Sequence, residues 1–403
     1  MIKNKVGIEI LLVAMLLVGI ALVPVVSAQS ENDYSVTAEE AFKHANTHMI
    51  DFIAADAPGF ENWTGASIDP KPVELYDING QKLFYQFSVY KAKKLIGTID
   101  ICADKTLGHS INDIAFDPKP YKAAEAKKKS KEIAKKNYPN GKIKSTIMVV
   151  YSYPSIGAMT VVKDKTTGDE YRIFVDAYTL EEVQDKPATE TELGVWSMYE
   201  MKLKNGVEEN LKEWEKSDQL TKSIEQAAAN KGVNINVAVT EENMNKLSTD
   251  AAITASTSKK LGVPLRGQEK DIYCGEASIQ MISLYYGKPT PTQTSIYNYF
   301  FGPRDQPSGL NPSEMIEWAK NKWGKTGSLD TSLTNSEVVT EIDKNRPFYS
   351  MTTNPNHYRV CQGYLIQNGY FYIYINDPMP IGSTGTPKIE LGSSLENKRI
   401  YIR

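Results

Sequence analysis

The sequence predicts an α+β fold in which helices alternate with antiparallel sheets. Segments with helical periodicity alternate with runs rich in Val, Ile, Tyr and Phe, and Asn-Gly turn pairs join two of these β-rich runs to the next. An Asn-Gly pair between alternating apolar segments favours a tight hairpin between antiparallel strands. The chain of 403 residues is long enough for two or three domains of this kind.

Residues 29–110 are expected to form a first helix-plus-sheet unit. Thr37 and Glu40 have the spacing of a capping box at the start of a helix over residues 38–55. The strands follow, with a turn at Asn79-Gly80 between "VELYDI" and "KLFYQFSVYKA". One side of the helix is apolar, through Ala41, Ala45, Met49, Ile50 and Ile53.

Residues 111–185 repeat this order of elements. A Lys- and Ala-rich helix over residues 121–136 precedes the β-rich runs "STIMVVYSY", "AMTVVKD" and "EYRIFVDAYTL". The two units also end alike, in "TIDICADKTLG" (98–108) and "YRIFVDAYTLE" (171–181). Both loosely resemble the PepSY-like modules found in prosegments of extracellular peptidases. The alternative is a pair of unrelated α+β modules.

Residues 186–260 differ in composition from the segments on either side. "KEWEKSDQLTKSIEQAAANKG" is polar and helix-forming, and "STDAAITASTSKK" (248–260) is rich in small polar residues. We expect a helical and polar linker here. A new domain over residues 261–403 then starts near "VPLRGQ".

The first 28 residues have the pattern of a secretory signal. Lys3 and Lys5 precede an apolar run over residues 10–26, and a small-residue cleavage site ends at Ala28. The run is long for a signal peptide and short for a membrane span of about 20 residues, so cleavage is favoured and anchoring through the run is the alternative. Either way, we expect a secreted or cell-surface protein.

Composition narrows the kinds of partner and site. The net charge of −3 gives no support to nucleic-acid binding. The odd number of cysteines leaves at least one outside any disulfide, although one pair could bridge. His44 and His48 lie one helical turn apart, but no third ligand has suitable spacing, so a solvated helix face is expected and not a metal site. The cysteines are Cys102, Cys274 and Cys361.

Cys274 is the main candidate for a catalytic residue. It begins "CGEASIQMISLYYG", where apolar residues repeat at helical spacing and Gly287 ends the run. Unpaired N–H groups and the helix dipole at a helix start favour the thiolate and can hold a developing oxyanion, while Gly275 leaves room beside the sulfur. From this stretch alone, a small buried residue at a helix start is an equal alternative.

Three further residues have the types and order that a thiol nucleophile requires. His357 is the one histidine in residues 261–403 and begins a strand, and Asp377 ends the following strand. Neighbouring strands would bring the carboxylate close enough to orient the imidazole. Gln268, six residues before Cys274, offers a side-chain amide as a second oxyanion donor.

Together, "Q-x5-CG", "HYxVxxGY" and "NDP" resemble the papain-like cysteine peptidases, and among them the bacteriocin-processing (double-glycine leader) peptidase-like family. The resemblance covers residues 261–403 and implies a papain-like domain, in which the helix bearing the nucleophile packs on an antiparallel sheet. It implies Cys274 as nucleophile and His357 as its base. Asp377 would orient that base, and Gln268 would donate to the oxyanion. The implied substrate is a peptide or protein, with no metal or organic cofactor.

Two features depart from that family. The bacteriocin processors carry their peptidase domain on a membrane exporter, whereas nothing in this sequence has the pattern of a P-loop ATPase. Glu276 also stands where small residues or proline are common in the family.

Two neighbouring features have simpler interpretations. Cys361 lies four residues beyond His357, roughly 13 Å along a strand, so we expect a core residue and not a second catalytic thiol. The aromatic run over residues 370–375 is expected to be a strand with alternate faces buried.

The sequence thus predicts an exported cysteine peptidase that works through an acyl-enzyme. A transglutaminase-like acyl transferase would use the same residues, and a cell-surface binding protein would keep the fold without the chemistry. Two units without catalytic residues precede the peptidase domain. We therefore also expect residues 29–250 to restrain the site, as in a zymogen, until the stretch 248–260 is cut.

Overall fold

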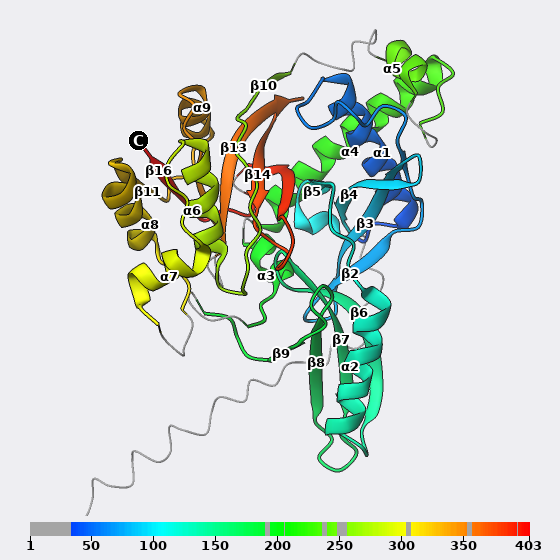
Figure 1. Ribbon diagram of the computed structural model, residues 1–403. Helices are drawn as coiled ribbons and strands as arrows, with labels where there is room; N and C mark the ends of the chain where they lie inside the picture. Colours follow the sequence, from blue (N-terminus) through cyan, green and yellow to red (C-terminus); the bar gives the residue numbers. More distant parts are fainter. Residues whose placement is uncertain are drawn as a thin grey trace, which may run out of the picture. The chain divides into compact units, whose positions relative to one another are not determined.

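One hydrogen-bonded sheet connects the strands of residues 36–403 in the computed structural model (Figure 1). The export signal expected over residues 1–28 lies outside the residues that the structure describes. These are residues 34–189, 194–204, 206–235, 240–247, 256–303, 308–352, 357–392 and 394–403.

The first unit begins with helix α1 (Ala38–Ala54), close to the predicted bounds. The Thr37 side chain accepts a hydrogen bond from the Glu40 N–H at 3.1 Å, but the Glu40 carboxylate pairs with Lys105 at 3.0 Å. The turn at Gly80 is present between two antiparallel strands, with a left-handed φ of +87° that a residue without Cβ adopts readily. The other elements of this unit are β1 (Ser67–Ile68), β2 (Val73–Asp77), β3 (Lys82–Lys91), β4 (Lys94–Cys102), η1 (Lys105–Leu107) and β5 (Ile111–Phe116).

Strand β5 lies beyond the boundary expected at residue 110 and still belongs to the first sheet. It pairs antiparallel with β4, so that Asp113 lies directly opposite Asp100. The first sheet therefore extends to residue 116.

The second unit continues the same sheet. Its strand β6 (Lys142–Ser152) lies parallel to β2, with Tyr76 opposite Val149. The two N-terminal units are therefore joined edge to edge. The other elements are α2 (Ala123–Asn137), which packs on the strands, and β7 (Ser155–Lys163), β8 (Glu170–Asp176) and β9 (Glu182–Val183).

The expected linker is helical, but its longest helix is part of the N-terminal core. Helix α4 (Val207–Asn230) packs against α1 and η1, and it buries Trp214 and Ile224. The shorter helices α3 (Met198–Leu203) and α5 (Glu241–Leu247) flank it. This part of the chain contributes to packing and is not a spacer.

The two histidines of α1 are buried, so the predicted solvated face is wrong. His44 Nδ1 lies 2.9 Å from Thr221 Oγ1, and His48 Nε2 lies 2.9 Å from Ser110 Oγ. Thr221 is 177 residues along the chain from His44, on α4. The helix that covers this face is therefore too distant in sequence for the local pattern to reveal it.

The C-terminal part packs helices on one face of its strands. Its helix α6 (Cys274–Tyr285) contacts β13 (His357–Gln367), which is visible beside it in Figure 1. The neighbouring strands are β14 (Tyr370–Asp377) and β15 (Thr386–Leu391). The other elements are β10 (Thr257–Lys260), α7 (Gln293–Phe301), α8 (Pro312–Trp318), η2 (Ala319–Trp323), β11 (Gly327–Asp330), α9 (Asn335–Asp343), β12 (Phe348–Thr352) and β16 (Lys398–Ile402).

The N-terminal region covers the opposite face of these strands. Strand β5 pairs with β15, and the Tyr372 ring of β14 meets the Phe52 ring of α1 edge-on at 5.1 Å. Tyr370 and Tyr374 belong to the same N-terminal core, whereas Ile373 faces the helices of the C-terminal part. Strand β14 is therefore buried on both faces, whereas the sequence predicted burial on alternate faces.

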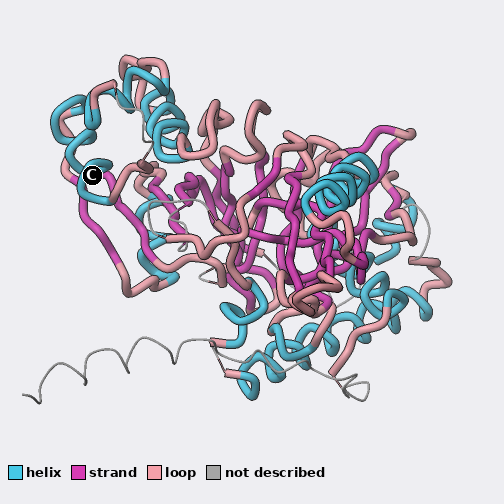
Figure 2. Tube along the Cα trace, turned by 90° about the horizontal axis from the view of Figure 1, so that it is seen from below, coloured by secondary structure: helices cyan, strands magenta, loops and turns pink. Residues whose placement is uncertain are grey.

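The complete strand order follows from these pairings. It is β11-β16-β12-β13-β14-β15-β5-β4-β3-β2-β6-β7-β8-β9, with β1 paired to β3 and β10 to β13. Figure 2 shows helices on both sides of the strands. Within the described ranges, none of the helices combines the length and the apolar character needed to cross a membrane.

Candidate active site

Cys274 occupies the first position of α6. The residue before it, Tyr273, has non-helical backbone angles, and its side chain does not cap the helix. The first backbone N–H groups of α6 have no carbonyl partner within the helix and lie at the end that carries Cys274. A Cβ on Gly275 would lie 3.0 Å from the Leu310 side chain. The Leu310 side chain thus packs closely against Gly275, where a larger residue would crowd it.

The Cys274 thiol is buried, with the residue 6% exposed. Burial raises its pKa to about 12 and the charge of Glu276 adds to the rise, while backbone N–H groups of Tyr358 and Gly275 oppose it. The thiol is therefore protonated in this arrangement. It needs a base before it can act as a nucleophile.

Helix α6 is fixed to the strand that carries His357. Ser278 Oγ, one turn beyond Cys274, donates a hydrogen bond to the Tyr358 carbonyl at 3.2 Å. The backbone N–H of Tyr358 also reaches the Cys274 thiol. The structure thereby places the candidate nucleophile next to the residue that follows the candidate base.

His357 and Asp377 are hydrogen-bonded, as the sequence predicted for adjacent strands. His357 Nε2 lies 2.8 Å from Asp377 Oδ1, and both residues are buried. With a carboxylate as acceptor, Nε2 carries the proton that is donated. Nδ1 is then the ring nitrogen that can accept a proton.

Asp377 is held as a carboxylate. Burial alone would raise its pKa, but the charges of His357 and Lys388 more than offset this and hold the pKa well below its usual range. The Met379 N–H donates to Oδ1 at 3.0 Å, and Lys388 Nζ lies 3.4 Å from Oδ2. Sequence reasoning missed Lys388, because a lysine in the run "PKIEL" is typical of an exposed strand face.

Gln268 lies beside the Asp377 loop, but its amide is already engaged. Its backbone N–H donates to the Pro378 carbonyl, and its Nε2 donates to the carbonyls of Lys270 and Asp271, each at 2.9 Å. An amide has two N–H donors, so both are used. As an oxyanion donor, Gln268 would have to exchange one of these carbonyls for the substrate oxygen.

Glu276 is a buried acid in the first turn of α6. It is fully buried, and neither carboxyl oxygen has a hydrogen-bond partner beyond its own backbone among the described residues. Burial raises its pKa to about 8, and the charge of Glu314 on α8 contributes. Burial thus favours the protonated form of Glu276 near neutral pH, and its charge acts on Cys274 once the pH exceeds about 8.

The other two cysteines are core residues. Cys361 and Cys102 are fully buried, which confirms the core position expected for Cys361. All three cysteines lie in the described part of the chain, and none forms a disulfide. In that same part of the chain, no group of three or more His, Cys, Asp or Glu side chains is arranged to hold a metal ion.

A helix-borne cysteine beside a strand-borne His–Asp pair defines the papain-like class of cysteine peptidase sites. Residues 260–397 match the model of the Peptidase_C39 like family. The C-terminal part of this chain is therefore a papain-like cysteine peptidase domain of the C39 type, and the protein is a cysteine-type peptidase.

Two solved structures are also similar to parts of the chain. One, from Bacillus anthracis and described as a C39-like peptidase, is 16% identical over 36% of this chain and 98% of that one, with a TM-score of 0.29. The other, UfSP from C. elegans, is 12% identical over 36% of this chain and 34% of that one, with a TM-score of 0.28. No curated protein matches the sequence.

Proposed function

We propose that this chain is an exported peptidase that cleaves peptide bonds with Cys274 as nucleophile, His357 as base and Asp377 as the residue that orients the base. The observation that carries this proposal is the 2.8 Å bond between His357 Nε2 and Asp377, with the Cys274 thiol beside the next backbone N–H of the same strand. A carboxylate on Nε2 leaves Nδ1 available for the thiol.

The reaction follows from these positions. His357 takes the thiol proton, and the sulfur bonds to the carbonyl carbon of the peptide while the carbonyl oxygen becomes an oxyanion. The N–H groups at the start of α6 and the Gln268 amide hold that oxygen. The C–N bond then breaks, and His357 gives its proton to the departing amine. Water, activated by His357, hydrolyses the remaining thioester and restores the thiol.

The test is covalent labelling of the mature chain with a thiol-directed epoxide inhibitor, followed by peptide mapping. We expect one modification, at Cys274, and complete loss of peptide hydrolysis. Labelling at Cys361 with loss of activity would contradict the assignment. Mass spectrometry of the products with and without added amines separates hydrolysis from acyl transfer, because a transferase would form amide products.

Export is proposed from the pattern of residues 1–28. A positive start, an apolar run and a small-residue site favour a cleaved signal and a secreted or cell-surface protein. N-terminal sequencing of the exported protein should give Gln29 as the first residue. An intact N-terminus in the membrane fraction would indicate anchoring through residues 10–26.

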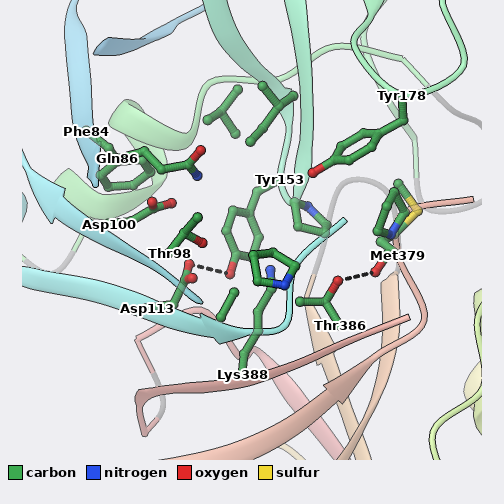
Figure 3. Close-up of a pocket in the computed structure, with 16 residues that line it drawn as sticks. Phe84, Gln86, Thr98, Asp100, Asp113, Tyr153, Tyr178, Met379, Thr386 and Lys388 are labelled. Carbon is green, nitrogen blue, oxygen red and sulfur yellow. Dashed lines mark hydrogen bonds between the residues drawn. The ribbon is translucent and has the colours of Figure 1, made fainter. Parts of the chain in front are cut away.

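Restraint by residues 29–250 is proposed from the state of the thiol and from what surrounds the site. The thiol is buried, and burial raises its pKa to about 12, away from the reactive thiolate form. Asp176 of the second N-terminal unit is close enough to raise the pKa of Asp271 beyond the effect of burial, in the loop before α6. Tyr153 and Tyr178 line one cavity together with Met379 (Figure 3). The second unit therefore shares a cavity with the loop after β14, and its Asp176 acts electrostatically on the loop before α6.

The restraint is tested by a specific protease site placed within residues 248–255 of the otherwise unchanged chain. We expect cutting to increase both peptide hydrolysis and the alkylation rate of Cys274. The matched control is the same protein treated with inactivated protease. Equal rates before and after cutting would reject restraint and favour a substrate-binding or targeting role for the N-terminal units.

A further inference from the structure

Lys388 of β15 contacts the carboxylate that orients His357. Its Nζ lies 3.4 Å from Asp377 Oδ2, with the lysine side chain 10% exposed and the aspartate side chain fully buried. The other oxygen, Oδ1, lies 2.8 Å from His357 Nε2. Among the described residues Oδ2 has no hydrogen-bond partner, so the charge of Lys388 offsets the cost of burying it.

Acidic and aromatic side chains of the N-terminal region lie on the other side of Lys388. In the sheet, Lys388 pairs with Ala115 of β5, and the next same-face position on each strand pairs Glu390 with Asp113. Figure 3 shows the Lys388 side chain extending from β15 toward Tyr153 and Asp113. Its Nζ lies 5.0 Å from the centroid of the Tyr153 ring, whose hydroxyl donates to Asp113 Oδ2 at 3.2 Å.

These surroundings keep Lys388 charged although it is buried. Burial alone would lower its pKa, but the charges of Asp377, Asp113 and Glu390 outweigh it, so the pKa is raised. Arg359 of β13 acts in the opposite sense, but its guanidinium is paired with Glu390 at 2.8 Å. Lys388 is thus an ammonium between Asp377 of the peptidase domain and Asp113 of the first N-terminal unit.

A second buried carboxyl, Asp100, lies next to Asp113. It lies directly opposite Asp113 in the sheet, and burial together with the charge of Asp113 raises its pKa well above the usual range. Asp113 is the carboxyl of this sheet whose charge acts on Lys388.

A cavity borders the ammonium of Lys388. A cavity of about 50 Å³ borders Lys388, Asp113 and Asp100, which is room for a few water molecules. Asp100 Oδ1 is buried there without a hydrogen-bond partner among the described residues.

We propose that Lys388 is a positioning residue of the peptidase and that Asp113, from the N-terminal region, sets how strongly Lys388 acts on Asp377. The proposal rests on the roles given above to Cys274 and His357. A cation at Oδ2 keeps Oδ1 turned toward His357 and weakens the negative field at the imidazole. An anion behind that cation restores part of the field. Removing the cation and removing the anion must therefore shift the protonation of His357 in opposite directions.

The test is an NMR titration of the full mature chain with labelled histidines. The chain has four histidines, and burial lowers the pKa of His44 to about 4, of His109 to about 3 and of His48 well below its usual value. The His357 resonance is assigned by its loss in His357→Gln. The readout is the pH at the midpoint of its titration, which does not depend on turnover.

We expect Lys388→Met to move that midpoint up by roughly 0.5–1 pH unit, because the field of Asp377 is no longer offset. Asp113→Asn should move it down by a smaller amount, because Lys388 then acts undiminished. Lys388→Arg should restore the wild-type midpoint. Lys388→Met should also lower kcat by roughly tenfold or more with little change in KM, because Asp377 is less well oriented.

Two variants serve as matched controls. Asp77→Asn removes a buried carboxyl that accepts hydrogen bonds from Ser197, Tyr199 and Asn79. Lys202→Met removes a buried lysine whose charge acts on His109. Both should leave the His357 midpoint unchanged.

Shifts in the same direction for Lys388→Met and Asp113→Asn, or no shift in either, would overturn the inference. If Lys388→Met does not fold, a downward shift in Asp113→Asn supports the inference and its absence rejects it. The proposed function is tested separately. Hydrolysis that survives Cys274→Ala would reject the proposed function whatever the titrations show, whereas an inactive Cys274→Ala with unmoved titrations rejects only the role of Lys388.

Discussion

Cys274 and Cys361 are both buried in the peptidase domain, so the same substitution at each site can distinguish a nucleophile from a packing residue. In Cys274 and Cys361, burial is the main cause of a raised thiol pKa, but only Cys274 stands at a helix start next to the His357 strand. Cys274→Ser should abolish hydrolysis, because the hydroxyl is a far weaker nucleophile in this site.

Cys361→Ser is the matched control, since it makes the same exchange at a buried site. It should retain hydrolysis and lose about 1–3 kcal/mol in the free energy of unfolding, because a hydroxyl is buried among apolar groups. Peptide hydrolysis and denaturant unfolding measure the two effects. Inactivation by Cys361→Ser alone would contradict the choice of nucleophile.

Glu276 gives the second prediction at the residue scale. Its carboxyl holds a proton in the folded state up to about pH 8, whereas the unfolded chain releases it near the ordinary value for glutamate. Binding of this proton stabilises the folded state. Its contribution to the free energy of unfolding is fully present below the pKa of an ordinary glutamate and is lost as the pH rises through about 8. Between pH 5 and 8 the wild-type protein should lose stability relative to Glu276→Gln, by up to about 1.4 kcal/mol per pH unit. Parallel unfolding curves for both proteins over this range would show that Glu276 ionises normally.

At the scale of the elements, the loop before α6 has to serve both structure and chemistry. Gln268 holds the carbonyls of Lys270 and Asp271 in the resting state, and Gly267 has no room for a Cβ, which would meet the Ser383 carbonyl. Gln268→Ala should lower kcat by roughly 10²–10³, the usual loss for one oxyanion donor. Steady-state kinetics test this, with circular dichroism to check folding. Unchanged kcat would mean that Gln268 only holds the loop.

Local signals in the sequence predicted several elements correctly. The capping residue Thr37, the turn at Gly80 and the helix that begins at Cys274 depend on residues within a few positions of one another, and all three are present. Long-range packing was not predictable in the same way. His44 looked exposed because its cover comes from α4. Lys388 was not singled out, because Asp377 lies on another strand and Asp113 on another unit.

At the scale of the whole of residues 36–403, the main unpredicted feature is the continuity of the sheet. The sequence indicated three successive helix-plus-sheet regions, which could equally form three separate sheets. Instead β2 pairs with β6, and β5 pairs with β15. Pairings of this kind depend on edge strands that lie far apart in sequence and leave no short-range pattern. They also explain why the aromatic residues of β14 are buried on both faces, since α1 supplies the second cover.

This continuity predicts how the protein behaves when its chain is cut. After cleavage within residues 248–255, the two pieces should elute together in size-exclusion chromatography and separate only in denaturant, because β5–β15 pairing and the Phe52–Tyr372 contact remain.

Phe52→Ala should weaken that association, whereas Phe174→Ala, which removes an equally buried ring from the second unit, should not. Each substitution should cost about 3–5 kcal/mol in the free energy of unfolding of the uncut chain. Because the two costs are alike, a difference in co-elution between the variants reports the contact between the two pieces and not their general stability. Spontaneous separation of the unmodified pieces would show that the junction is weaker than its strand pairing implies. Activation by cutting would then follow from release of residues 29–250, whereas activation of pieces that stay together would require a rearrangement within the docked assembly.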